Sequence, residues 1–153
     1  MFPSDGGNSM LKWYRVRNPL RVVVNFLVIY ACRFLPSLAL KRALLRLLGM
    51  KVGRNVSIGL GATFDIFFPE LIEIGDNSVI GYNAAILAHE FLVHEWRRGR
   101  VRIGRDVMLG AKCLVLPGVE IGDGATIAAY SLVNRDVPPG AFAAGVPARV
   151  RRR

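Results

Sequence analysis

The chain has two histidines, His89 and His94, whose imidazoles can exchange a proton near neutral pH. His89 stands in the segment Ala88-His89-Glu90, where a regular six-residue pattern fails and a longer loop begins. An imidazole at such a place could remove a proton from a substrate hydroxyl or amine. A surface histidine at the root of a loop fits the same local features equally well, so both interpretations stay open here.

The six-residue pattern surrounds His89 and extends over most of the chain. Eleven of its twelve aliphatic positions hold Ile, Leu or Val, and seven of the twelve are followed directly by Gly. The fifth position of each hexad is small or β-branched in ten of the twelve. The aliphatic positions are Val52, Ile58, Phe64, Ile74, Ile80, Ile86, Ile103, Leu109, Val115, Ile121, Ile127 and Val133.

Hexapeptide repeats are typical of parallel β-helices, in which three short strands make one triangular coil of about 18 residues. The aliphatic residue points inward, and the small residue and glycine let the chain turn at the corners. The pattern therefore predicts a mainly β fold, a left-handed parallel β-helix of about four coils at 52–69, 74–91, 103–120 and 121–138. A meander of antiparallel strands would show an alternation of two instead.

Two insertions interrupt the count of six. Four extra residues, 70–73, separate the first two coils, and eleven extra residues, 92–102, separate the second from the third. Insertions in a solenoid leave as loops from one face, which is often the binding face. The longer loop includes His94-Glu95-Trp96-Arg97-Arg98-Gly99-Arg100.

Residues 1–50 read as an N-terminal helical segment that precedes the β-helix domain at 51–138. Asn18-Pro19 is a favourable helix start, Pro36-Ser37 separates two helices, and Gly49 ends the second. The apolar run 22–32 is about half of what a membrane span needs. We expect residues 18–48 to cover the open end of the first coil, with peripheral membrane contact as the alternative role.

The charge of +10 is concentrated at the two ends of the chain. Residues 1–50 carry +7, residues 51–138 carry −1, and a basic tail at 139–153 carries +4. A nucleic-acid partner is not expected, because such binders spread basic residues over the folded face. Cys32 and Cys113 lie 81 residues apart in apolar surroundings, a pattern that is neither a disulfide framework nor a metal spacing. We therefore expect free thiols and, with no secretory signal, a cytoplasmic protein.

Several motifs together resemble one known family, the hexapeptide-repeat acyltransferases, and most of all its galactoside, maltose and streptogramin O-acetyltransferases. These motifs are the hexads, Ala88-His89-Glu90 before a loop, Leu116-Pro117-Gly118-Val119, and the ending 144–150. The resemblance covers about residues 50–152. It implies a homotrimer that holds acetyl-CoA in a groove between neighbouring β-helices, and it implies that His89 is the general base.

Three further residues are candidates for the acceptor side of such a site. Asp65 stands where the first coil breaks pattern, and its carboxylate could orient the histidine, hold an acceptor hydroxyl or cap a turn. Glu70 and Trp96 are weaker candidates for acceptor contacts. His94 matches no functional position of the family, and we expect it to line the loop or to lie on its surface.

For the cofactor, the resemblance points to corner amides of the last coils and to basic residues near the end, with no metal. The matching positions are Gly110, Ala111, Ala128, Ala129, Asn134, Arg149 and Arg152. Tyr130 departs from the family pattern, which often has glycine there, and this puts the pantetheine contact at that corner in doubt.

Two other functions remain as alternatives. His89 and His94 are five residues apart, a spacing that γ-type carbonic anhydrases use for zinc, but a catalytic zinc site wants three protein ligands and the chain has no third histidine. A non-catalytic β-helix scaffold would not bind acyl-CoA. The sequence does not identify the acceptor.

Overall fold

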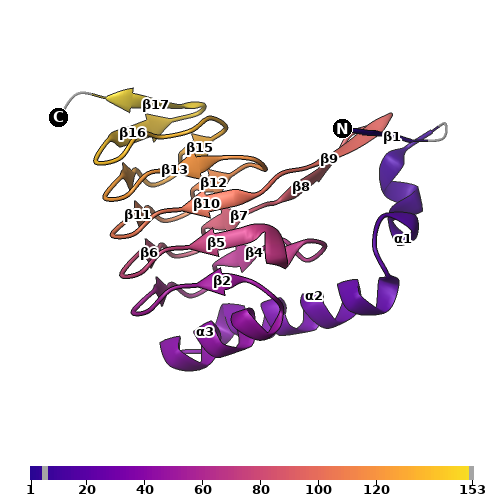
Figure 1. Cartoon of the computed structure of the whole chain (residues 1–153), viewed down its shortest axis with the longest axis horizontal. Coiled ribbons are helices and arrows are strands. Elements are labelled where there is room, and N and C mark those ends of the chain that lie inside the picture. The colour runs from indigo at the N-terminus through magenta and orange to yellow at the C-terminus, as the bar shows by residue number, and fades with distance from the viewer. Residues whose placement is uncertain (5–6, 152–153) are drawn as a thin grey trace.

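The hexads form three parallel sheets whose strands are stacked coil upon coil in a computed structural model, which describes residues 1–4 and 7–151 (Figure 1). The first sheet has the order β2 (Lys51–Val52), β5 (Ile72–Ile74), β10 (Val101–Ile103) and β13 (Glu120–Ile121). The second has the order β3 (Ser57–Ile58), β6 (Val79–Ile80), β11 (Met108–Leu109), β14 (Thr126–Ile127), β16 (Phe142–Gly145) and β17 (Ala148–Arg151). The third has the order β4 (Thr63–Phe64), β7 (Ala85–Ile86), β12 (Leu114–Val115) and β15 (Leu132–Val133).

The register of these sheets places each predicted aliphatic residue on its equivalent in the next coil. In the first sheet Val52 pairs with Ile74, Ile74 with Ile103, and Ile103 with Ile121. All twelve aliphatic positions are buried and together fill the interior. The predicted left-handed parallel β-helix of four coils is therefore confirmed.

The solenoid continues beyond residue 138, where the hexad count ended. Val137 forms a parallel bridge with Ile121, and Ala143 of β16 pairs with Ile127. β17 then folds back on β16 as an antiparallel strand. The basic ending up to Arg151 is thus part of the second sheet, and Arg152 lies outside the described residues.

The long insertion forms a hairpin of β8 (His89–Phe91) and β9 (Glu95–Arg98), which projects from the prism. The N-terminal strand β1 (Phe2–Pro3) pairs antiparallel with β9 and completes a small sheet. Segments more than 90 residues apart in sequence thus meet at this loop (Figure 1). The shorter insertion begins with the single 3₁₀ turn η2 (Pro69–Leu71).

The N-terminal helices are η1 (Ser9–Lys12), α1 (Trp13–Val16), α2 (Pro19–Phe34) and α3 (Leu38–Leu47). Asn18 and Ser37 cap α2 and α3 with their side chains, as the sequence indicated. α2 and α3 lie beneath the first coil, at the end of the solenoid opposite β17 (Figure 1). Among the described residues, no helix is long and apolar enough to cross a bilayer.

Both cysteines are buried free thiols, as expected. Burial raises the pKa of the Cys113 thiol to about 11, and it also raises the pKa of Cys32. Thiols that stay protonated at neutral pH are poor nucleophiles, so neither cysteine is suited to covalent chemistry.

Close approach between coils makes some glycines indispensable. A Cβ on Gly81 would lie 2.6 Å from the carbonyl carbon of Gly110 and 2.6 Å from the Leu109 oxygen, both backbone atoms of the next coil. At Gly140, by contrast, a Cβ would meet nothing within 4 Å, although its φ of +66° favours glycine.

We expect Gly81→Ala to lower the free energy of unfolding by about 3 kcal/mol, because two coils must separate to admit the methyl group. The matched variant Gly140→Ala carries only the left-handed backbone strain, about 1 kcal/mol. Urea denaturation followed by circular dichroism measures both. Equal losses in the two variants would contradict the close-packing argument.

Candidate active site

Asp65 organises the turn that follows β4, where the hexad pattern first breaks. Its Oδ1 accepts hydrogen bonds from the backbone N–H groups of Phe67 at 2.8 Å and Phe68 at 2.9 Å. An aspartate that accepts bonds from amides two and three residues ahead stabilises a tight turn. The residue is 1% exposed, so this carboxylate is buried inside the turn that it stabilises.

The second oxygen of the same carboxylate holds His89, one coil away. Oδ2 accepts from the backbone N–H groups of Ala88 at 2.7 Å and His89 at 2.8 Å. It also lies 2.5 Å from Nδ1 of the His89 ring. Asp65 therefore caps a turn and orients the histidine at once, two roles that the sequence left as alternatives.

The charge on Asp65 fixes which ring nitrogen of His89 is available. Burial favours a raised pKa for the Asp65 carboxyl, but the hydrogen bond and charge of His89, with the amides of Phe68 and Ala88, lower its pKa below 3.8. The ionised carboxylate can only accept, so Nδ1 of His89 must carry the hydrogen. The lone pair of the neutral ring is then on Nε2, the nitrogen that can act as a base.

Aromatic rings enclose the imidazole on several sides. The ring centroid of Phe67 lies 4.4 Å from that of His89, Phe91 lies at 5.1 Å and Phe68 at 5.9 Å. The His89 side chain keeps 12% of its surface exposed. The ring is therefore held in one orientation with a small opening to solvent.

A second layer of side chains surrounds this aromatic cluster. Trp96 of β9 stacks on Phe68 at 5.8 Å, and Phe2 of β1 stacks on Trp96 at 4.4 Å. The Arg98 guanidinium lies 5.2 Å from the centre of the Phe68 ring. Trp96 therefore adjoins the site through Phe68.

Glu70 reaches the same cluster through an arginine. Arg17 lies 5.1 Å over the Phe68 ring and pairs with Glu70 Oε1 at 2.7 Å. The other oxygen, Oε2, is shielded from solvent and has no hydrogen-bond partner within the described structure. Glu70 thus brings an unused acceptor close to the aromatic cluster.

Sequence reasoning missed several of these residues. Phe67 and Phe68 were visible as a break in the hexads, and that signal could have marked them as site residues. Phe2, Arg17 and Arg98 gave no such signal, because only tertiary folding brings them to the loop.

The remaining histidine lies apart from this cluster. His94 is exposed in the turn between β8 and β9, whereas His89 begins β8 at the prism. Throughout residues 1–4 and 7–151, no three His, Cys, Asp or Glu side chains are grouped to hold a metal ion. His94 therefore does not join the Asp65–His89 pair.

The predicted cofactor residues occupy two different corners of the prism. Gly110 and Ala111 follow β11, Ala128 and Ala129 follow β14, and both pairs lie at the corner after the second sheet. Asn134 follows β15 at the corner after the third sheet. His89 follows β7 at that same corner, two coils away from Asn134. Within one chain, the corner that holds Gly110, Ala111, Ala128 and Ala129 is therefore a different corner from the one that holds His89.

Other predicted features near the C-terminus are exposed. Arg149 lies on β17 with its side chain in solvent, and its guanidinium donates to the Ala148 carbonyl. Tyr130 adopts a left-handed backbone with φ of 60°, and its ring lies 5.4 Å from the Lys112 ammonium. Its ring is largely exposed, so it borders the corner at Ala128 from outside.

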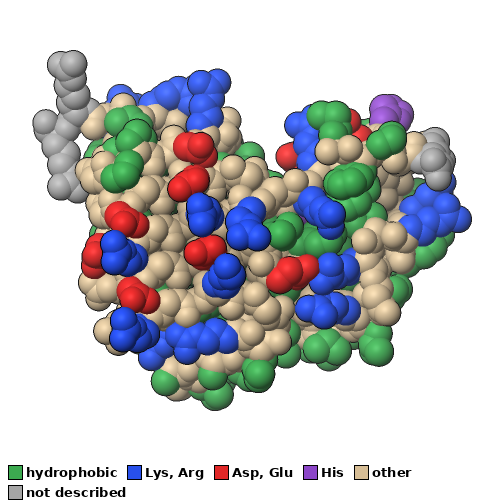
Figure 2. Space-filling model, viewed as in Figure 1, with side chains coloured by type: hydrophobic (Ala, Val, Ile, Leu, Met, Phe, Trp, Pro, Cys, Tyr) green, Lys and Arg blue, Asp and Glu red, His purple; other side chains and the backbone are tan. Residues whose placement is uncertain are grey.

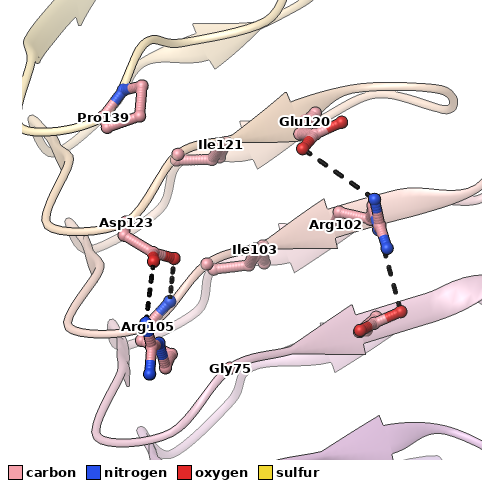
Figure 3. A pocket seen from close by; sticks show the side chains of 11 residues that line it. Gly75, Arg102, Ile103, Arg105, Glu120, Ile121, Asp123 and Pro139 are labelled. Carbon is pink, nitrogen blue, oxygen red and sulfur yellow. Dashed lines mark hydrogen bonds and ion pairs between the residues drawn. The ribbon is translucent and has the colours of Figure 1, made fainter.

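A hollow of about 370 Å³ lies on a different flank, over strands β5, β10 and β13 of the first sheet (Figure 3). Arg102 lies between Glu73 and Glu120 at 3.8 and 4.0 Å, and Arg105 pairs with Asp123 at 3.5 Å. These opposite charges satisfy one another. The hollow contains none of the residues of the histidine site.

Comparisons with known proteins agree with this architecture. Residues 100–135 match the family model for bacterial transferase hexapeptides (six repeats), and residues 49–88 match the hexapeptide repeat of succinyl-transferase. YvoF of Bacillus subtilis (strain 168), provisionally named an acetyltransferase, is 50% identical over 97% of this chain and 87% of its own length. A protein of Staphylococcus aureus (strain MSSA476) with the same provisional name is 43% identical over 94% of this chain and 90% of its own.

A solved structure extends the comparison to a complex. A galactoside acetyltransferase bound to coenzyme A superposes with a TM-score of 0.69 at 28% identity, over 88% of this chain and 80% of that one. The repeat, the fold and the relatives over nearly the full length lead to one conclusion. The chain belongs to the hexapeptide-repeat acetyltransferases.

Proposed function

We propose that this enzyme transfers an acetyl group from acetyl-CoA to a hydroxyl of a sugar-like or other small-molecule acceptor, with His89 as general base. The observation that carries the proposal is the 2.5 Å contact between Asp65 Oδ2 and His89 Nδ1, which leaves Nε2 as the basic nitrogen.

The proposed mechanism begins with proton transfer. Nε2 of His89 takes the hydroxyl proton of the acceptor while the acceptor oxygen attacks the thioester carbonyl carbon, and the Asp65 carboxylate stabilises the resulting imidazolium. The carbon–sulfur bond then breaks, and the imidazolium returns the proton to the sulfur. The products are an acetyl ester and free CoA, and His89 is neutral again.

The two separate corners support a site shared between protomers. The family relation suggests a homotrimer with parallel solenoids, in which CoA would lie in the groove between neighbours. In that arrangement, the corner at Gly110, Ala111, Ala128 and Ala129 would hold the CoA whose acetyl group reaches His89 of the adjoining copy. The galactoside acetyltransferase complex with coenzyme A supports a cofactor site in this fold.

Glu70 and Trp96 are proposed as acceptor-side residues. Glu70 is partly exposed and is held beside the Phe68 ring by its ion pair with Arg17, so its carboxylate is proposed to accept a hydrogen bond from an acceptor hydroxyl. Trp96, which is half-buried and stacks on Phe68, offers aromatic surface near His89 that suits the apolar face of a ring-shaped acceptor. The acceptor would therefore carry both a hydroxyl and an apolar face.

The first prediction of the proposed function tests the general base. His89→Ala should lower kcat by about 10²–10⁴-fold, since the acceptor hydroxyl loses its proton acceptor. His94→Ala, which removes the other histidine from an exposed turn, should retain turnover. An acceptor screen that detects free CoA thiol finds the substrate and measures both variants. Near-normal turnover of His89→Ala in a protein of unchanged assembly size would refute the assignment.

The second prediction concerns Asp65→Asn. The substituted amide places an N–H₂ group, which can only donate, where one carboxylate oxygen accepted hydrogen bonds. The free energy of unfolding should therefore fall by about 1–3 kcal/mol. The kcat should also fall by roughly 10²–10⁴-fold, because the tautomer of His89 is no longer fixed.

The pH dependence of Asp65→Asn follows from the lowered pKa of Asp65. A carboxyl whose folded-state pKa is depressed stabilises the fold above its ordinary value of 3.8 and loses this contribution as pH falls through the folded value. The stability gap to the wild type should therefore narrow as the pH falls below about 4. Denaturant midpoints measured below pH 4 give the gap, and a gap that does not narrow there would contradict the lowered pKa of Asp65.

The third prediction concerns two arginines near the C-terminus. Arg149 and Arg152 are proposed to bind the phosphates of CoA, since guanidinium pairs well with phosphate oxygens. Arg149→Ala with Arg152→Ala should raise the KM for acetyl-CoA severalfold and affect acetyl-dephospho-CoA much less. Steady-state kinetics with both donors decides this. An equal loss with both would show that neither arginine reads the 3′-phosphate.

A further inference from the structure

Helices α2 and α3 each place one buried polar side chain among the apolar residues that they pack against the solenoid. Asn25 of α2 is buried, and its Nδ2 donates to the carbonyl of Ile66 at 2.8 Å. Lys41 of α3 is 1% exposed, and its Nζ donates to the carbonyls of Ile58 at 3.0 Å and Gly59 at 3.4 Å. The first coil has no coil beneath it, so Asn25 and Lys41 supply donors to the Ile66 and Ile58 carbonyls at this end of the solenoid.

The opposite side of α2 is apolar and faces outward. Leu20, Val24, Leu27 and Phe34 recur at spacings of four, three and seven residues, which places them on one stripe of the helix. Their exposed fractions are 73%, 46%, 58% and 65%. A helix at the surface of a water-soluble protein normally has a polar outward side, whereas α2 is apolar on both sides, because Val22, Ile29 and Cys32 are buried against the solenoid.

The stripe continues onto α3. Leu47, 82% exposed, lines a shallow groove together with Leu20 and Val24. We call Leu20, Val24, Leu27, Phe34 and Leu47 the apolar end face. α2 and α3 form the end of the molecule beneath the first coil, and hydrophobic side chains gather along that edge (Figures 1 and 2).

Basic side chains surround this face. By helical position, Arg21 and Arg33 lie on the two flanks of the apolar stripe of α2. Residues 7–64 contain ten Lys and Arg and no Asp or Glu. In Figure 2, Lys and Arg form a row just above the hydrophobic edge. An apolar face with a basic border is complementary to an anionic lipid surface, where acyl chains lie beneath negative headgroups.

We propose that the apolar end face docks on an anionic lipid bilayer, with α2 lying in the plane of the interface. The helix is too short to cross a bilayer, which is why it would lie in the interface. A second copy is a poorer occupant, because two end faces meeting head to head would bring their basic borders together. In the trimer of the proposed function, parallel solenoids would present three end faces on one side and strengthen binding by avidity.

The test is cosedimentation of the full-length protein with vesicles of phosphatidylcholine alone or mixed with phosphatidylglycerol. We expect binding to the mixed vesicles, weakened by added salt, which screens the basic border. Leu27→Gln with Phe34→Gln should weaken binding at least about tenfold. The matched control is Val93→Gln with Val150→Gln, two exposed apolar residues in the hairpin turn and on β17, and it should bind as the wild type does.

Three results would overturn the proposal: no binding of the wild type to the mixed vesicles, equal binding by the two double variants, or a smaller assembly of the Leu27→Gln, Phe34→Gln protein in sedimentation equilibrium. The last result would show that the face joins copies of this chain. Release of CoA with a soluble acceptor should be unchanged in this variant. Lipid docking and acetyl transfer can therefore fail independently.

Discussion

The pairing register between successive coils is the constraint from which the rest of the structure follows. Most strands are only two or three residues long, so none is stable without the coil above or below it. A slip of one residue would turn the aliphatic side chains out of the core and the polar ones into it. Because Phe64 pairs with Ile86, Asp65 comes within reach of Ala88 and His89. The geometry of the candidate site is thus a product of the stacking.

The surroundings of His89 combine a buried charge with apolar walls. Asp65 accepts four backbone hydrogen bonds and the contact from the ring, so its charge is well compensated despite its burial. The phenyl rings add no competing polar group. An imidazole in this setting has one defined partner on Nδ1 and an available Nε2, which is the arrangement that proton transfer requires.

The sequence predicted those parts of the fold that repeat. The stacked positions from Val52 to Val133 are recognisable because their period is six and their residue types are uniform. The continuation at Ala143 was missed, since alanine is a weak signal for an inward position and β17 runs antiparallel. Asp65 and His89 stood out as breaks in the pattern, although only the structure shows that they touch.

Other features depend on contacts that no local pattern encodes. Phe2 reaches Trp96 because β1 pairs with β9, and nothing in the first few residues indicates this. The helical spacing of α2 was visible in the sequence, but the side that faces the coil was not. Ordinary amphipathicity favours a buried apolar stripe. Val22, Ile29 and Cys32 form such a stripe on α2, but its outward side is apolar as well, so the spacing alone did not decide between the two sides. Asn25 and Lys41 lie within the buried sides of α2 and α3 and donate to carbonyls of the first coil.

The hydrogen bond from Asn25 to the Ile66 carbonyl has a practical consequence for dissecting this molecule. Ile66 is the direct neighbour of Asp65, so α2 is fastened to the loop that holds the histidine. A truncation that removes the helices would also release this loop and expose the underside of the first coil. Loss of turnover in a shortened protein would then say nothing about where the intact enzyme resides. The helical segment and the solenoid are one mechanical unit, and single side chains are the right scale at which to separate their roles.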